Sequence, residues 1–194
     1  MTNRKLRIVT RCIAFAVMAS GVGALLGAQT PSTPSAAVPA APTTDWKNYS
    51  YAEDGFSASF PSAPEFSKRD VPTEKGSFEL RSYLVEFEPV ALFAGVCDYG
   101  SAIAGMDTEK VLHGAEDGAL KNSNSHLISD KKTTFGVYHA LTFEAESDTA
   151  HFSARIYLVG STLYQTLVVY PIGKPYDGAS RFLDSFQLIA RVAK

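Results

Sequence analysis

The chain has 194 residues, of which 45% are hydrophobic and 20% charged, and its formal net charge at pH 7 is −2. Beyond the first 28 residues its basic residues form no cluster, because Lys68 with Arg69 and Lys131 with Lys132 are isolated pairs of the kind found on solvated strand edges. This charge balance argues against a nucleic acid or an anionic membrane surface as partner.

The first 28 residues have the layout of an export signal. Four basic side chains come first, and an uncharged apolar run over residues 13–28 follows. The run is shorter than the roughly 20 residues of a membrane-spanning helix. We therefore expect cleavage after Ala28, no transmembrane segment in the mature chain, and a bacterial protein that is periplasmic or secreted. The basic residues lost are Arg4, Lys5, Arg7 and Arg11, which leaves 14 basic and 20 acidic residues and a net charge of −6.

Residues 29–44 consist almost entirely of proline, alanine, serine and threonine. Such a segment buries too little apolar surface to offset its ordering entropy, so we expect a disordered linker. The remaining residues, 45–194, suit a single domain with one core.

One of the two cysteines lies in the expected signal and the other in the expected domain. Cys12 is lost with the signal, so the mature molecule cannot form an internal disulfide. Cys97 lies in an apolar run without an adjacent base or cation. This setting favours a buried small hydrophobic residue over a nucleophile.

Apolar and polar residues alternate with period two through most of the domain, which predicts strands. In the last strand, Leu163 would face inward and Val168 the opposite side. The Gly160–Ser161 pair before it fits a two-residue hairpin connection with glycine first. The expected strands cover residues 55–61, 77–87, 90–99, 129–134, 137–146, 150–159 and 162–170, with an irregular edge strand near 67–74.

Two segments show helical periodicity. Asp107 can cap a helix over residues 108–120, which carries one apolar stripe, and a second helix is expected over residues 176–186. Strands outnumber helices and are joined mostly by hairpins. The sequence therefore predicts an α+β domain, an antiparallel sheet with helices packed on it.

Three stretches together resemble the secreted bacterial relatives of the PsbP/Mog-type family. They are residues 55–61 with Pro64 after them, the hairpin over residues 155–165, and the ending over residues 181–186. The resemblance covers residues 51–188. It implies an α/β/α sandwich and a non-enzymatic domain that binds other proteins or larger assemblies. It brings no shared catalytic residue, and the export signal argues against the intracellular, GTPase-binding branch.

The histidines and acidic residues offer two candidate metal sites. His139 and His151 lie on neighbouring expected strands and could face each other. Glu144, Glu146 and Asp148 are spaced to point to one face of a strand. Half-exposed histidines and solvated acids are the favoured interpretations, since His113, His126 and the other histidines lack metal-motif spacing and the acids lack a calcium loop. We expect no metal, cofactor or catalytic residue, and folding that chelation does not weaken.

Tyrosine is mildly over-represented in the last strands, at Tyr138, Tyr157, Tyr164 and Tyr170. Tyrosines suit a binding face, and they equally suit the half-buried face of a sheet beneath a helix, which is the favoured interpretation.

The leading functional hypothesis is a non-enzymatic exported domain of the cell envelope that binds a protein partner or acts as an accessory subunit. The alternative is a small-ligand carrier or an enzyme that uses a cleft between sheet and helices. A concave pocket with convergent polar groups and perturbed titratable residues would favour the alternative.

Overall fold

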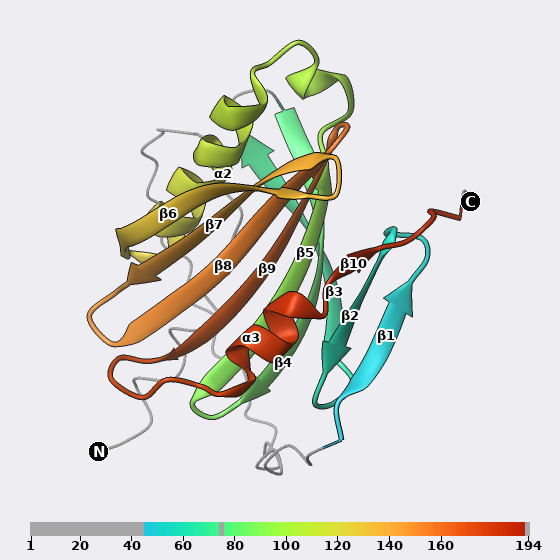
Figure 1. Cartoon of the computed structure of the whole chain (residues 1–194). Coiled ribbons are helices and arrows are strands. Elements are labelled where there is room, and N and C mark those ends of the chain that lie inside the picture. The colour runs from blue at the N-terminus through green and yellow to red at the C-terminus, as the bar shows by residue number, and fades with distance from the viewer. Residues whose placement is uncertain (1–44, 74–75, 193–194) are drawn as a thin grey trace, which may run out of the picture.

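The structure is a computed structural model that describes residues 45–73 and 76–192. The expected export signal and linker lie outside the described residues. Within the described part, no helix has the length and apolar character needed to cross a bilayer. The elements in chain order (Figure 1) are β1 (Lys47–Tyr51), β2 (Phe56–Phe60), β3 (Glu65–Thr73), β4 (Gly76–Phe87), β5 (Val90–Asp98), the 3-10 turn η2 (Gly100–Ile103), α2 (Thr108–Ser123), β6 (His126–Phe135), β7 (Tyr138–Glu146), β8 (Ala150–Val159), β9 (Thr162–Pro171), α3 (Gly178–Asp184) and β10 (Gln187–Leu188).

Seven strands form one large antiparallel sheet in the order β3-β4-β5-β9-β8-β7-β6. Hairpins join most neighbours, as the sequence predicts. In the β8–β9 hairpin, Val159 pairs with Thr162, so Gly160 and Ser161 are the whole connection. Gly160 has φ 61°, in the left-handed region that favours glycine, so the two-residue connection with glycine first is confirmed.

A second, three-stranded sheet in the order β1-β2-β10 makes the expected α+β class wrong. Strands account for 55% of the described residues and helices for 19%. The domain is therefore a β-rich fold. The small sheet, and not helices alone, packs against one face of the large sheet. The sequence analysis missed this sheet because β10 has two residues and pairs with a strand about 130 positions earlier.

Two cores lie on opposite faces of the large sheet. One lies beneath α2, where Leu112, Ala115 and Leu163 are buried. The other lies between the large sheet, the small sheet and α3, and it is dominated by aromatic rings such as Phe56, Phe182 and Tyr164. Figure 1 shows α2 and α3 on opposite faces, with β1, β2 and β10 beside α3. The central strands are consequently buried on both sides.

Helix α2 begins where the sequence predicts and ends three residues later. The Asp107 side chain accepts a hydrogen bond from the Lys110 backbone N–H at 3.0 Å, which satisfies one orphan donor of the first turn. Asn124, with a left-handed backbone, ends the helix. Helix α3 is shorter than predicted, since it covers Gly178–Asp184 and leaves Phe186 buried just beyond its end.

Candidate functional site: a charged cleft beside the small sheet

A cleft of about 630 Å³ opens where the turn after β1 meets β3, β4 and the chain segment after β10. No helix contributes a residue to this cleft, so it is not the cleft between sheet and helices that the alternative hypothesis expects. Strands and loops supply its lining, which consists of Glu53, Asp54, Phe66, Lys68, Glu79, Arg81, Tyr83, Asp98, Arg191 and Val192.

Asp54 is the most buried charge of the cleft, with 3% of its surface exposed. The backbone N–H groups of Asp54 and Gly55 donate to the Tyr51 carbonyl at 3.0 and 2.8 Å, which fixes the turn. Arg81 Nε and Tyr83 Oη, both on β4, donate to its two carboxylate oxygens. Both oxygens of this buried carboxylate are thus hydrogen-bonded, as burial of a charge requires.

Gly55 allows the segment after β10 to close one side of the cleft. Its φ is 76°, and a Cβ there would lie 2.7 Å from Arg191 Cγ and 3.0 Å from Tyr164 Oη. The Ile189 N–H donates to the Gly55 carbonyl at 2.9 Å, and Val192 N–H donates to the Ala52 carbonyl at 3.0 Å. A larger residue than glycine would displace this segment.

Each cation of the cleft has an acidic partner. Lys68 Nζ lies 3.4 Å from Glu79, and Arg81 Nη1 lies 3.2 Å from Glu79 in addition to its contact with Asp54. Arg191 Nη1 lies 3.4 Å from Asp98 Oδ2. The cleft therefore presents alternating charges of both signs, which does not suit a polyanion.

The surroundings of Tyr83, Arg81 and Asp98 in the cleft shift the pKa of each away from neutral pH. Burial and then the hydrogen bond to Asp54 raise the pKa of the Tyr83 phenol. Burial opposes the charge of Arg81, but Asp54 outweighs it and raises the pKa of the guanidinium. Burial also opposes the charge of Asp98, and hydrogen bonds from Gly100 N–H and Ser161 outweigh it and lower the pKa of the carboxyl. These three groups do not exchange protons near pH 7, so they suit recognition rather than acid–base catalysis.

The cysteine interpretation is confirmed. Cys97 is buried in β5, and burial raises the pKa of its thiol to about 11. A thiol in this state is not nucleophilic at neutral pH.

The two histidines proposed to face each other do not meet. In the β7–β8 register His151 pairs with Glu146, whereas Ala140, the neighbour of His139, pairs with Tyr157 at the far end. The possible His139–His151 metal site is therefore wrong, because antiparallel pairing places the two residues at opposite ends of the hairpin.

Two of the three acidic residues instead surround His151. Its Nε2 lies 2.7 Å from Glu144 and its Nδ1 3.0 Å from Glu146, and its ring stacks on Tyr170. Asp148 follows the end of β7 and has no part in these contacts. Burial alone would lower the pKa of His151, but the hydrogen bonds and charges of Glu146 and Glu144 outweigh it and raise the pKa.

This arrangement predicts a pH-dependent contribution to stability. A raised folded-state pKa means that the His151 contribution is complete below about pH 6.5, the ordinary histidine value, and is lost as the pH rises through the folded-state pKa. His151→Gln should therefore lower the free energy of unfolding by about 1 kcal/mol at pH 5.5 and by less at pH 9. Urea denaturation of both proteins across this range measures the difference. The exposed His139→Gln is the control, and equal losses for His151→Gln at both pH values would contradict the prediction.

The tyrosines of the last strands do not form a common binding face. Tyr157 and Tyr164 are 2% and 3% exposed and pack in the aromatic core, stacked on or tilted against Phe186. Their burial supports the structural interpretation of these residues. The alternative of a tyrosine-rich docking surface is wrong for these two.

The sequence analysis did not single out the residues that build the cleft. Asp54, Arg81, Tyr83 and Arg191 come from three segments that are far apart in the chain, and none forms a local motif. The only local signals were the alternation of β4, which placed Arg81 and Tyr83 on the same side, and Gly55 after two acidic residues.

Comparisons with known proteins bear on the fold. No protein-family model matches the chain, and no curated protein matches it. A solved structure that is similar is the solution structure of cyanobacterial PsbP (CyanoP) from Synechocystis sp. PCC 6803. The identity is 14% and the TM-score is 0.53, over 75% of this chain and 94% of that one. At this identity the similarity shows the fold alone: this chain has a PsbP-like fold.

Proposed function

We propose that the protein is a non-enzymatic accessory domain of the bacterial cell envelope that binds an extended segment of a protein partner in the charged cleft. Residues 1–28 are a cleaved export signal in this proposal, residues 29–44 a linker and residues 45–194 the binding domain. The observation that carries it is the lining of the cleft, in which charges of both signs surround an exposed phenylalanine.

The chemistry of the cleft supports binding over catalysis. Its lining holds neither histidine nor cysteine, and the pKa shifts of Arg81 and Tyr83 keep both protonated at neutral pH. A general base needs a pKa near the working pH. The paired charges supply geometric complementarity instead, which favours the correct partner over others.

An extended peptide segment fits the position of the cleft. Phe66 and Lys68 lie two residues apart on β3 and both line it. β3 is an edge strand of the large sheet, and an edge strand can accept main-chain hydrogen bonds from an added strand. Phe66, at 48% exposure, would be the apolar anchor of such a contact.

Substitution of Phe66 tests this proposal. Purified protein carrying Phe66→Ser should capture its partner from the envelope fraction, after cross-linking, about tenfold less than the parent, as expected for loss of an interface anchor. Val137→Ser is the matched control, because Val137 is 87% exposed in the β6–β7 turn and does not line the cleft. Equal loss with both variants, or no loss with Phe66→Ser, would show that binding does not use the cleft.

A small-molecule carrier is the second candidate, because a volume of about 630 Å³ falls within the range of ligand sites. Native mass spectrometry distinguishes a small-molecule carrier from a peptide-binding domain. A bound small molecule in the parent that is absent from the Phe66→Ser protein would favour the carrier.

The proposed export has a direct test. Protein recovered from the envelope fraction should begin near Gln29 on N-terminal sequencing, since signal cleavage follows small residues such as Ala28. An intact Met1 in the soluble cytoplasmic fraction would contradict the proposed location.

A further inference from the structure

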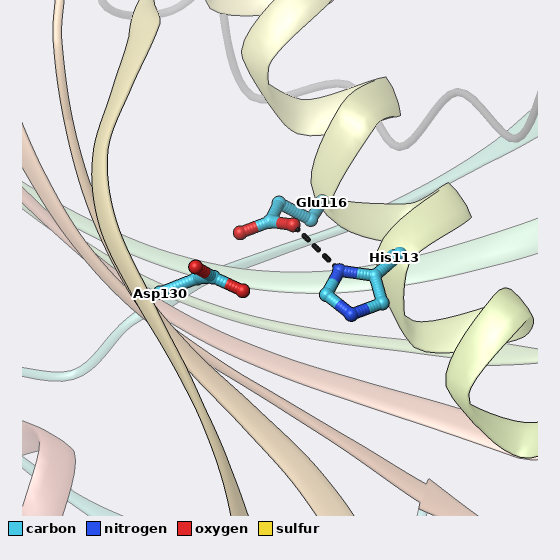
Figure 2. Close-up of side chains that lie close together, drawn as sticks. All are labelled: His113, Glu116 and Asp130. Carbon is cyan, nitrogen blue, oxygen red and sulfur yellow. Dashed lines mark hydrogen bonds and ion pairs between the residues drawn. The ribbon is translucent and has the colours of Figure 1, made fainter.

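His113, Glu116 and Asp130 bring three potential metal ligands together, on the face of the large sheet away from the cleft. One donor atom from each lies within 4.8 Å of the others. Figure 2 shows His113 and Glu116 on consecutive turns of α2, with the carboxylate of Asp130 reaching toward them from β6. The i, i+3 spacing places the first two side chains on one face of the helix.

Glu116 supplies an independent sign that a ligand is missing. The residue is 3% exposed, and its Oε1 is buried with no hydrogen-bond partner among the described residues. Burial raises the pKa of this carboxyl, and Asp130 adds to the effect. A buried carboxylate oxygen without a partner costs free energy that a bound cation would recover.

The separation of His113 and Glu116 also fits shared coordination. His113 Nδ1 lies 3.0 Å from Glu116 Oε2. Two ligands that each lie about 2.1 Å from a tetrahedral zinc ion are about 3.4 Å apart, so these two atoms would have to separate by only about 0.4 Å. The contact seen here would therefore need little rearrangement to become two bonds to one metal.

We propose that His113, Glu116 and Asp130 bind a divalent transition-metal ion, with zinc as the preferred metal. The imidazole favours a borderline metal over calcium or magnesium, and the two carboxylates balance the 2+ charge. Water would complete the coordination on the side of exposed Asp130. Metal binding would displace the proton shared by His113 and Glu116.

A metal held by these three residues would differ from the sequence-based expectation of a metal-free protein, since none of them belongs to the candidate sites at His139, His151, Glu144, Glu146 and Asp148. A domain of this size can fold on its core alone, so the metal would add stability without being required for folding. Chelated protein should therefore remain folded, and zinc should raise its Tm.

Zinc titration of the purified, untagged full chain tests the proposal. After removal of metal with EDTA, calorimetry should show one zinc ion bound per chain. Glu116→Gln, His113→Gln and Asp130→Asn should each weaken binding about tenfold or more, since each removes one of three ligands. Manganese should bind more weakly than zinc.

Two controls make the result specific. Glu109→Gln changes an exposed acid on the same helix, which pairs with Lys132 outside the cluster, and His139→Gln removes an exposed histidine elsewhere. Both should bind zinc like the parent. The variants at His113 and Asp130 alter half-exposed or exposed side chains, so they remain informative if Glu116→Gln fails to fold. Absence of zinc binding, or binding that survives all three ligand substitutions, would overturn the site.

Discussion

Replacing Arg81 by methionine is expected to lower the free energy of unfolding by about 3–5 kcal/mol, the usual cost of breaking a buried ion pair from one side. The methionine retains the apolar stem of Arg81 but leaves the buried carboxylate of Asp54 with Tyr83 as its remaining side-chain partner. Guanidinium denaturation at pH 7 measures the loss.

Two further variants decide whether burial of the charge is the cause. Lys68→Met breaks the exposed pair with Glu79 and should cost less than about 1 kcal/mol. Asp54→Asn combined with Arg81→Met removes both charges and should recover much of the stability lost in Arg81→Met. If Arg81→Met unfolds like the parent, or if the double variant is no more stable than Arg81→Met, then Asp54 does not need its counter-charge.

The elements that the sequence predicted well are those with local signals. The β8–β9 hairpin follows from alternation on both sides of Gly160, and the start of α2 follows from Asp107 at its N-cap. The β4–β5 connection agrees with the expected strands over residues 77–87 and 90–99, because Phe87 pairs with Val90 in the structure. Each of these signals lies within a few residues of the structure that it specifies.

The parts that the sequence did not predict depend on contacts between distant segments. β10 has two residues, too few for any periodicity, and it becomes a strand only because β2 offers an edge to pair with. The cleft also depends on a distant contact, since Arg191, just after β10, lies 3.4 Å from Asp98 at the end of β5. Period and composition carry no information about such a contact.

The proposed metal cluster combines a local signal with a contact between distant segments. The i, i+3 spacing of His113 and Glu116 is visible in the sequence, but the pair is neither two histidines at metal-motif spacing nor a row of acids on one strand. Asp130 joins the other two only because the sheet places β6 beside α2. The burial of Glu116, which distinguishes this cluster from a solvated pair, could not be read from the local pattern.

The two-sided burial of the large sheet leads to the prediction with the largest effect. The sequence pattern of β9 assigned Leu163 to the core and left Val168 on the opposite face. In the structure both are 0% exposed, Leu163 beneath α2 and Val168 in the aromatic core shared with the small sheet. Val168→Asp should therefore cost about 4 kcal/mol or more, as much as Leu163→Asp, because each places an unpaired carboxylate in an apolar core.

Val137→Asp is the matched control for this prediction, since it makes the same chemical change at a side chain that is 87% exposed. It should change stability by less than about 0.5 kcal/mol. Denaturation midpoints, or soluble yield where a variant does not fold, rank the three proteins. If α3 and the aromatic core cover this face of β9 as the structure shows, the stabilities of Val168→Asp and Leu163→Asp should be similar and far below that of Val137→Asp. A Val168→Asp protein that melts near the control would mean that this face of β9 is open to solvent. The aromatic core that β9 shares with α3 and the small sheet would then not form as the structure has it.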